Sequence, residues 1–577
     1  MFILRGIGVS DGICIGRARL ITNATLSLSD YTHMPESIDA ELARFDQAID
    51  TVRAELKELQ NSAANLPNEF SMFLMLHRML LDDALFTGSA REMIEAEGVS
   101  AEKSIVIKAL NLIEQLDGVE DNYFKERRAD VRQIAERVLK ALSGAQSWHF
   151  DESEEPAILV AHDLFPSDTL LFKHHHNCIG IATDTGGPTS HTAILGRGMN
   201  LPTVVGLQNA RSLIRENDLI IVNGFDGTLL VNPDSMLIDY YRNLSERFEK
   251  KQSRLKAIRF ADSVTKDGVS IQLFANMDTP DDIIAVKENG AVGVGLFRSE
   301  FLFLEQGTIV DEEEQFIIYR DAAIAMNPAP LTIRTLDLGA DKFLDHAIFD
   351  TPKNPALGKR GIRFSLSEPV DFLAQLRALL RASIYGKINI MFPMLSCPSE
   401  AIKITSLLER AKQSLEEEGL PFDPDIRVGA MIEVPSAALS IGSFAKYFDF
   451  FSIGSNDLIQ YAIAIDRCNS DVSHLYDPLN IGVLRLLHKA IVDANHYKRS
   501  ISICGEMASD ILFTRLLVGL GIRSFSIHPA NLLKVKAQIL TINTAKCKKK
   551  VNAMLEEDNS DKVEALFEEL NEDLDHG

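Results

Sequence analysis

The chain has 577 residues, of which 46% are hydrophobic and 24% charged, and its net charge is −23. One hydrophobic core rarely serves a chain this long, so we expect three or four domains. The negative charge argues against a nucleic-acid partner, because nucleic-acid binding depends on neutralising phosphates. Six cysteines without CxxC spacing favour neither a zinc site nor a disulfide framework. Without an apolar run of about 18 residues to insert into a membrane, a cytoplasmic location is expected.

The N-terminal part combines short β-rich runs with a helical block. Residues 8–22 indicate a strand pair, and further strands are predicted within 157–164, 178–184, 202–206, 219–224 and 227–232. From Ile38 to Leu59 the apolar residues recur at alternating spacings of four and three, which predicts an amphipathic helix. More helices are expected at about 67–83, 101–117 and 120–143. The early strands have no core of their own, so we expect them to join the later strands, with the helical block as an insertion.

A charge-rich helical segment at 233–262 is expected to link the two halves of the chain. Beyond it, apolar strands alternate with amphipathic helices. The strand candidates are 270–276, 291–297, 331–337, 388–394, 427–434, 448–454, 500–506 and 523–529. Eight strands alternating with helices over some 300 residues predict a (β/α)8 barrel. The acidic end of the chain, 555–577, reads as a solvated helical tail.

Chemically active side chains follow these predicted strands. They are Arg298, Arg334 with Asp337 and Lys342, Glu433, Asn456 with Asp457, Arg467, and Cys504. Strand ends of a barrel converge on one face, where arginines bind phosphate and carboxylate and acidic side chains suit Mg2+. A protonated thiol can act as an acid. Each residue alone is commonly a surface ion pair, a cap or a buried thiol, but five strand ends carrying such groups together predict a small, doubly anionic, magnesium-bound ligand.

A histidine stands in a different setting in the N-terminal half. Gly186 and Gly187 permit a tight turn, and Thr189 or Ser190 can cap a helix that begins near His191. A helix N-terminus favours an attached phosphate, and a neutral imidazole nitrogen can accept a phosphoryl group. Such a segment alone is more often a cap with an incidental histidine.

Residues 186–206 (GGPTSHTAILGRGMNLPTVVG) resemble the phosphohistidine signature of enzyme I of the phosphoenolpyruvate-dependent sugar phosphotransferase system. The segments GAVGVGLFRSEFLFL, RTLDLGADK, FDFFSIGSNDLIQYAIAIDR and ICGEMA resemble the phosphoenolpyruvate-binding barrel of the same family. The likeness runs from SDGICIGRA to about residue 540. It implies an α/β multidomain protein with a swivelling phosphohistidine domain (1–32 and 148–232), an inserted helical domain (33–147), a linker helix (233–262) and a barrel (263–577) that forms a homodimer.

The resemblance also implies roles for individual residues. His191 would be phosphorylated on Nε2 and Cys504 would protonate the enolate. Arg298, Arg334, Asn456, Asp457 and Arg467 would bind phosphoenolpyruvate, with Lys342 and Arg360 lining the site, and Glu433 and Asp457 would coordinate Mg2+. The phosphoryl group would then pass to the phosphocarrier protein HPr, docked near His77 and Arg127. Pro188 stands where the signature usually has an arginine.

Three other interpretations compete with this one. A phosphoenolpyruvate synthase or dikinase needs a nucleotide-grasping domain of a few hundred residues, for which the first 150 residues leave no room. A nitrogen-regulatory enzyme I would carry an additional N-terminal sensory domain, although a regulatory role remains open. A binding protein without turnover is disfavoured, since His191, Cys504 and Glu433 are all retained.

Overall fold

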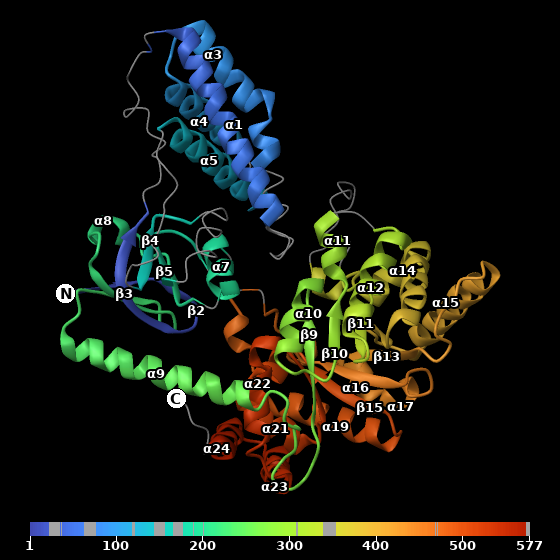
Figure 1. Ribbon diagram of the computed structural model, residues 1–577. Coiled ribbons are helices and arrows are strands. Elements are labelled where there is room, and N and C mark those ends of the chain that lie inside the picture. Colours follow the sequence, from blue (N-terminus) through green and yellow to red (C-terminus); the bar gives the residue numbers. More distant parts are fainter. Residues whose placement is uncertain are drawn as a thin grey trace. The chain divides into compact units, whose positions relative to one another are not determined.

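The computed structural model describes residues 1–21, 35, 37–62, 77–117, 122–143, 156–164, 177–187, 190–199, 201–306, 310–338, 354–467, 469 and 471–572. The chain divides into two compact units, Met1–Lys251 and Gln252–Gly577 (Figure 1). None of the helices in these ranges is both long and apolar enough to cross a membrane.

The N-terminal unit is built on a sheet that draws on both ends of its sequence. Its strands are β1 (Phe2–Arg5), β2 (Ile7–Ser10), β3 (Ile13–Leu20), β4 (Ala157–Ala161), β5 (Cys178–Thr183), β6 (Thr203–Val205), β7 (Leu219–Asn223) and β8 (Thr228–Val231), in the order β1-β8-β7-β3-β4-β5-β6-β2. As predicted, the early strands join the later ones: β3 pairs in parallel with β4 and antiparallel with β7. The sequence did not predict β1, which pairs antiparallel with β8. Short helices α7 (His191–Met199) and α8 (Ala210–Leu213) accompany this sheet.

The longest helices among the described residues between β3 and β4 are four. They are α1 (Ile38–Ser62), α3 (Ser89–Glu97), preceded by a π-helical turn at Ala84–Gly88, α4 (Ala101–Asp117) and α5 (Asn122–Leu142). They run side by side (Figure 1) around a core of their own that includes Phe45, Val52, Ile94, Ile105 and Val138. The predicted helix over 67–83 falls mostly outside the described residues, and α3 was not predicted.

Helix α9 (Ser235–Ala257) forms the predicted link between the halves. Near its start, Leu237, Tyr241 and Leu244 pack against the N-terminal sheet. Near its end, Leu255 belongs to the core of the C-terminal unit. The division between the two units therefore falls within a continuous helix.

The C-terminal unit is a closed parallel barrel, as predicted. Its strands are β9 (Gln272–Met277), β10 (Val294–Arg298), β11 (Leu331–Arg334), β12 (Ile388–Phe392), β13 (Arg427–Ile432), β14 (Phe450–Gly454), β15 (Ser500–Cys504) and β16 (Ser524–Ile527), and β16 pairs with β9 to close it. Each of the eight predicted segments overlaps one of these strands. The strands are mostly buried because helices cover a parallel sheet closed into a barrel.

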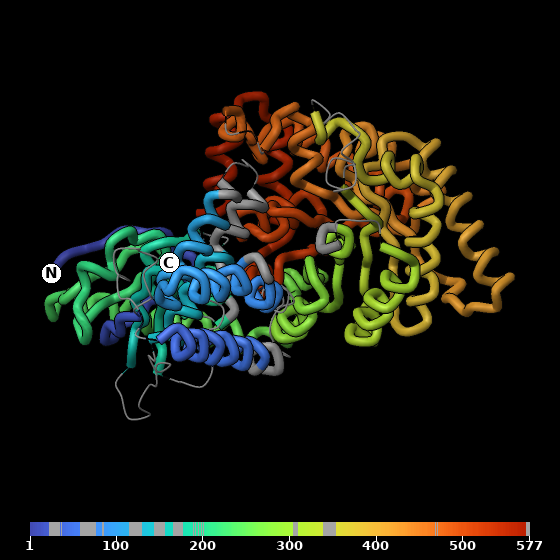
Figure 2. Tube along the Cα trace, turned by 90° about the horizontal axis from the view of Figure 1, so that it is seen from above, coloured from blue at the N-terminus to red at the C-terminus, as the bar shows by residue number. Residues whose placement is uncertain are grey.

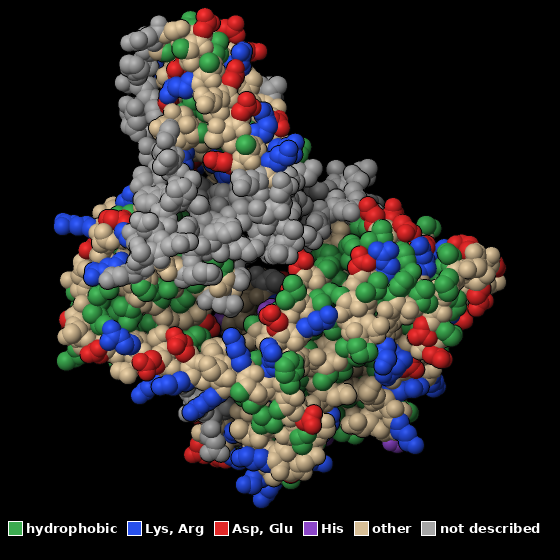
Figure 3. All heavy atoms as spheres, in the orientation of Figure 1, with side chains coloured by type: hydrophobic (Ala, Val, Ile, Leu, Met, Phe, Trp, Pro, Cys, Tyr) green, Lys and Arg blue, Asp and Glu red, His purple; other side chains and the backbone are tan. Residues whose placement is uncertain are grey.

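The surrounding helices are α10 (Ile283–Glu288), α11 (Glu300–Gln306), α12 (Glu312–Met326), α13 (Ile362–Ser367), α14 (Pro369–Ala382), α15 (Pro398–Glu417), α16 (Pro435–Leu439), α17 (Ile441–Phe444), α18 (Ser455–Ile463), α19 (Ile481–His496), α20 (Glu506–Ser509), α21 (Ile511–Leu520) and α22 (Pro529–Ile539). Both ribbon and tube views show α15 projecting at one edge of this unit (Figures 1 and 2). Figure 3 shows acidic and basic side chains interspersed over the visible face of this unit.

As far as residue 572, the acidic end of the chain is not a solvated tail, so that prediction was wrong for the described residues. Helices α23 (Thr544–Glu556) and α24 (Ser560–Asn571) pack onto the barrel through buried apolar side chains such as Val551, Val563 and Phe567. The Phe567 ring lies 5.3 Å from the Phe513 ring of α21, measured between centroids. The acidic residues of α24 occupy its opposite, exposed face, which explains why the composition suggested a free helix.

Candidate active site

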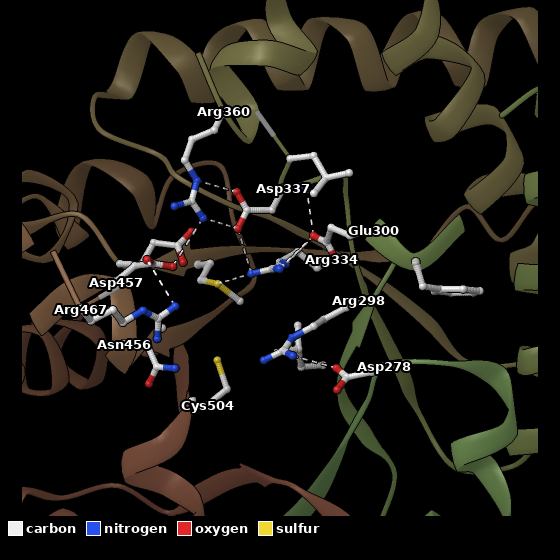
Figure 4. Close-up of a pocket in the computed structure, with 17 residues that line it drawn as sticks. Asp278, Arg298, Glu300, Arg334, Asp337, Arg360, Asn456, Asp457, Arg467 and Cys504 are labelled. Carbon is white, nitrogen blue, oxygen red and sulfur yellow. Dashed lines mark hydrogen bonds and ion pairs between the residues drawn. The ribbon is translucent and has the colours of Figure 1, made fainter. Parts of the chain in front are cut away.

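The carboxyl ends of the barrel strands surround a cavity of about 390 Å³. The charged, polar and thiol side chains that line it are Asp278, Arg298, Glu300, Arg334, Asp337, Arg360, Glu433, Asn456, Asp457, Arg467 and Cys504. The four guanidinium groups point toward a common centre from different strand ends and loops (Figure 4). Four cations around one small cavity form a site for a ligand with more than one negative charge.

Strand register sets two of these arginines side by side. Arg298 ends β10 and pairs in register with Arg334, which ends β11. Arg298 Nη1 lies 2.9 Å from Asp278 Oδ1, at the half-exposed side of the cavity. Arg334 is more buried, and its Nη2 lies 2.9 Å from Glu300 Oε1 while Nη1 lies 3.1 Å from Asp337 Oδ2. Burial alone would lower the pKa of Arg334, but the attraction of Glu300 and Asp337 raises it above its usual value.

The opposite side of the cavity is formed by two other arginines. Arg360, just before α13, lies 3.0 Å from Asp337 Oδ2 and 3.6 Å from Asp457 Oδ2 through its Nη2. Arg467, after α18, lies 4.0 Å from Asp457 Oδ1 and 3.8 Å from Glu506 Oε1. Arg360 is held firmly by Asp337, whereas the contacts of Arg467 are near 4 Å, so Arg467 can turn toward an incoming anion.

Three buried carboxylates, Asp337, Glu433 and Asp457, each offer an oxygen within 4.8 Å of the other two. Burial, followed by repulsion from Asp337 and Asp457, raises the pKa of Glu433 to about 8. The backbone N–H of Met394 donates to Glu433 Oε1 at 2.6 Å and fixes its direction. Crowded, buried oxygen ligands of this kind fit a hard divalent cation, which would relieve their mutual repulsion.

Cys504 ends β15 and is almost fully buried beside this cluster. Its thiol donates to the carbonyl of Ile453 at 3.3 Å, and the Ser452 hydroxyl donates to its sulfur at 3.5 Å. Burial raises the pKa of Cys504 above the ordinary thiol value. The next residue, Gly505, has φ +93°, and a Cβ there would lie 2.4 Å from Ser455 Oγ, so a glycine is required for this turn. Burial therefore favours the neutral, protonated form of this thiol at the wall of the cavity.

His191 lies in the other unit, at the start of α7 as predicted. The Ser190 hydroxyl accepts a hydrogen bond from the Ala193 backbone N–H at 3.3 Å and caps the first turn. The Thr192 hydroxyl donates to Asp163 Oδ1 at 3.2 Å, which ties this turn to the loop after β4. The side chain of His191 lies outside what the structure describes.

The structure brings together most of the barrel residues singled out in the sequence. Arg298, Arg334, Arg360, Glu433, Asn456, Asp457, Arg467 and Cys504 all line the one cavity. Lys342 falls outside the described residues, and so does the side chain of Arg127. The side chain of His77 is fully buried, with Nε2 3.6 Å from Asp130 Oδ1, and its place near a docking surface stays a prediction.

Sequence reasoning missed Asp278 and Glu300 as lining residues and gave Asp337 no role. Asp337 is named by its position after a strand, but its membership of the carboxylate triad needs the fold. Glu300 lies two residues beyond Arg298, in the first turn of α11. An acidic residue so close to a strand-end arginine was the available signal.

Three family models of phosphoenolpyruvate-utilising enzymes match this chain, which defines its class. The family model for the PEP-binding domain of PEP-utilising enzymes matches residues 252–544, and that for the mobile domain matches 153–227. The N-terminal model of the same enzymes matches 5–127.

Curated relatives narrow the class. The phosphoenolpyruvate-protein phosphotransferase of Cupriavidus necator is 43% identical over 99% of this chain and 99% of its own length. That of Staphylococcus aureus is 38% identical over 93% of this chain and 94% of its own length. A solved solution structure of enzyme I is 31% identical with a TM-score of 0.35 and covers 43% of this chain and 99% of its own length. The chain belongs to the enzyme I family of phosphoenolpyruvate-protein phosphotransferases.

Proposed function

We propose that the barrel binds phosphoenolpyruvate and that His191 takes its phosphoryl group. The observation that carries this proposal is the convergence of Arg298, Arg334, Arg360 and Arg467 on one cavity beside the carboxylate triad. Phosphoenolpyruvate carries a carboxylate and a phosphate, and several arginines are needed to hold both. The capped N-terminus of α7 gives His191 a setting that favours an attached phosphate.

In the proposed reaction, an imidazole nitrogen of His191 attacks the phosphorus of phosphoenolpyruvate in line with the enolate oxygen. The N–P bond forms as the P–O bond breaks, and the electron pair stays on the enolate. The methylene carbon of the enolate takes the proton of the Cys504 thiol and gives pyruvate, after which water restores that proton. Mg2+, for which Glu433, Asp457 and the adjoining Asp337 are the proposed ligands, would supply charge neutralisation at the phosphate.

A swivelling motion follows from this proposal, because one histidine has to meet both the barrel and the next acceptor. We assign residues 1–32 and 148–232 to the swivelling domain, 33–147 to the partner-docking domain, 233–262 to the linker and 263–577 to the barrel. The acceptor is the phosphocarrier protein HPr, as the enzyme I family implies, in the first step of sugar uptake. Dimerisation through the barrel is proposed on the same ground. The five described cysteines are all free thiols, which supports a reducing, cytoplasmic setting.

The test uses phosphoenolpyruvate labelled at phosphorus, with Mg2+ and without ATP. We expect acid-labile label on His191 that passes to added HPr, and none on a His191→Ala variant. An Arg334→Met variant should also stay unlabelled, because a neutral side chain of similar length cannot hold the anion. A folded wild-type protein that takes no label would refute the proposal. Label that stays on His191 would point to another acceptor.

A further inference from the structure

We propose that Glu300 is a positioning residue that aims Arg334 and the Asp337 peptide at the substrate. This inference rests on the proposed function of the cavity. Glu300 lies in the first turn of α11, immediately after β10, and only 7% of its surface is exposed. Its carboxylate is thus held inside the protein at the junction of two strand ends.

One oxygen of Glu300 receives hydrogen bonds from two separate parts of the site. Arg334 Nε donates to Oε1 at 3.1 Å, and Arg334 Nη2 lies 2.9 Å from the same oxygen. The backbone N–H of Asp337 also donates to Oε1, at 3.0 Å. A single buried acceptor therefore holds an arginine of the cavity wall together with the peptide that carries one carboxylate of the triad (Figure 4).

The contact fixes which edge of the guanidinium is free. Glu300 takes the Nε and Nη2 edge, so Nη1 is the nitrogen left toward Asp337 Oδ2, at 3.1 Å, and toward Met431 Sδ, at 3.7 Å. Asp337 and Met431 both line the cavity. An anionic ligand would therefore meet Arg334 at Nη1, with the planar group already locked in orientation.

Glu300 differs from the other carboxylate that Arg334 contacts. Asp337 is shared, since its Oδ2 also lies 3.0 Å from Arg360 Nη2, and it belongs to the triad suited to a cation. Glu300 is not a member of that triad. Among the described residues, it is the ion-pair partner that Arg334 keeps when Asp337 is drawn to a cation. When a cation binds Asp337 and weakens the contact between Asp337 and Arg334, the charge of Glu300 still holds Arg334 in place.

The test compares Glu300→Gln with Glu312→Gln. Glu312 is a control because its carboxylate also pairs with arginine, with Arg377 at 2.6 Å and Arg381 at 2.8 Å, but it does not line the cavity. Affinity for phosphoenolpyruvate is measured by calorimetry with Mg2+, cation affinity by Mn2+ titration followed by electron paramagnetic resonance, and steady-state rates by pyruvate release.

We expect Glu300→Gln to weaken phosphoenolpyruvate binding by about tenfold or more, as for a lost charged hydrogen bond. KM should rise more than kcat falls, and Mn2+ binding should weaken as well. Glu312→Gln should leave all three unchanged while lowering the melting temperature. Glu300→Asp keeps the charge but has a shorter side chain, so it should also bind phosphoenolpyruvate more weakly. This variant replaces Glu300→Gln in the test if the glutamine variant does not fold.

Equal behaviour of the two glutamine variants in substrate affinity would overturn the inference and leave Glu300 a purely structural residue. So would wild-type affinity in Glu300→Gln. In both cases the wild-type protein still takes phosphate from phosphoenolpyruvate. A wild-type protein that binds no phosphoenolpyruvate would instead contradict the proposed function.

Discussion

The Cys504 thiol is built to keep its proton. Burial raises its pKa, and an ordinary cysteine is about half ionised near pH 8.5. Because the thiolate is the form that reacts, we predict that Cys504 resists iodoacetamide at pH 8.5 in the folded protein. Cys397, in the same unit and partly exposed, is the internal comparison. Alkylation of both, followed by mass spectrometry, checks this. Equal rates at the two cysteines would contradict it.

We expect Asp278 to compete with the substrate for Arg298. Their ion pair is 2.9 Å long, with both side chains partly exposed, at 51% and 41%. Exposed pairs contribute at most about 1 kcal/mol, which corresponds to roughly fivefold in affinity. Asp278→Asn is therefore expected to lower KM for phosphoenolpyruvate by about two- to fivefold, as measured in a pyruvate-release assay. Asp321→Asn, which breaks the exposed pair with Arg320 outside the cavity, is the control. An unchanged or raised KM in Asp278→Asn would refute the competition.

Most site residues were predictable because each follows a strand of a recognisable barrel. Arg298, Arg334 and Cys504 are the last residues of their strands, and that position alone directs them to the cavity. Glu300 and Asp278 could not be found in this way. Their importance depends on the arginines they contact, and such contacts arise only when neighbouring strand ends are brought together.

Asp267 fixes the start of helix α23, which lies 277 residues further along the chain. Its carboxylate accepts hydrogen bonds from the Thr544 hydroxyl and backbone N–H, at the start of α23, and from the Thr265 hydroxyl. The Thr544 hydroxyl, the largest contributor, lowers the pKa of Asp267 below its usual range. A carboxylate with a lowered folded-state pKa stabilises the fold above its unfolded pKa of about 3.9 and loses that effect as pH falls below it.

Asp267→Asn should therefore lower the stability of the C-terminal unit at pH 7. The variant should also lose less stability than the wild type when the pH falls from 5 to 2. Thermal unfolding followed by circular dichroism across this pH range measures both effects. The exposed Asp425→Asn serves as the control and should change neither. A variant as stable as wild type at pH 7 would show that the α23 cap is not maintained by this carboxylate.

Helix α24 packs against the barrel through apolar side chains. Loss of this packing should therefore destabilise the C-terminal unit. Phe567 is buried against Phe513, and Phe567→Ala is expected to lower the free energy of unfolding of the C-terminal unit by about 3 kcal/mol. Glu568→Ala, on the exposed face of the same helix, should have little effect. Urea unfolding measures the difference. Equal free energies of unfolding for the two variants would contradict the packing of α24 on the barrel and favour a free acidic tail.

The elements show where pattern reasoning works and where it fails. The barrel strands were found because apolar runs alternate with amphipathic helices. Helix α24 was misread because its many acidic residues concealed the apolar spacing Val563, Phe567, Leu570, which is typical of a buried helical face. Strand β1 is only Phe2–Arg5, mostly exposed at the edge of its sheet, and carries too little pattern to be recognised.

At the scale of the whole molecule, the two units have separate hydrophobic cores. The core of the C-terminal unit runs from Leu255 to Leu570, and the N-terminal sheet and helical block have their own cores. We predict more than one transition when the full chain is heated in a calorimeter. Phosphoenolpyruvate with Mg2+ should raise the midpoint of one transition only, and a chelator should cancel the shift. A single transition that moves as a whole would contradict this.

The pairing of β3 with β4 has a consequence for how the protein is made. These neighbours are joined in parallel register, yet β3 ends at Leu20 and β4 begins at Ala157. At about 5–20 residues per second, a ribosome delivers β4 roughly 7 to 27 seconds after β3. The helical block, whose contacts are local, can fold during that interval. During synthesis, β3 thus lacks its neighbour β4 while the helical block folds. Chaperones that bind exposed strands can act on β3 within this interval.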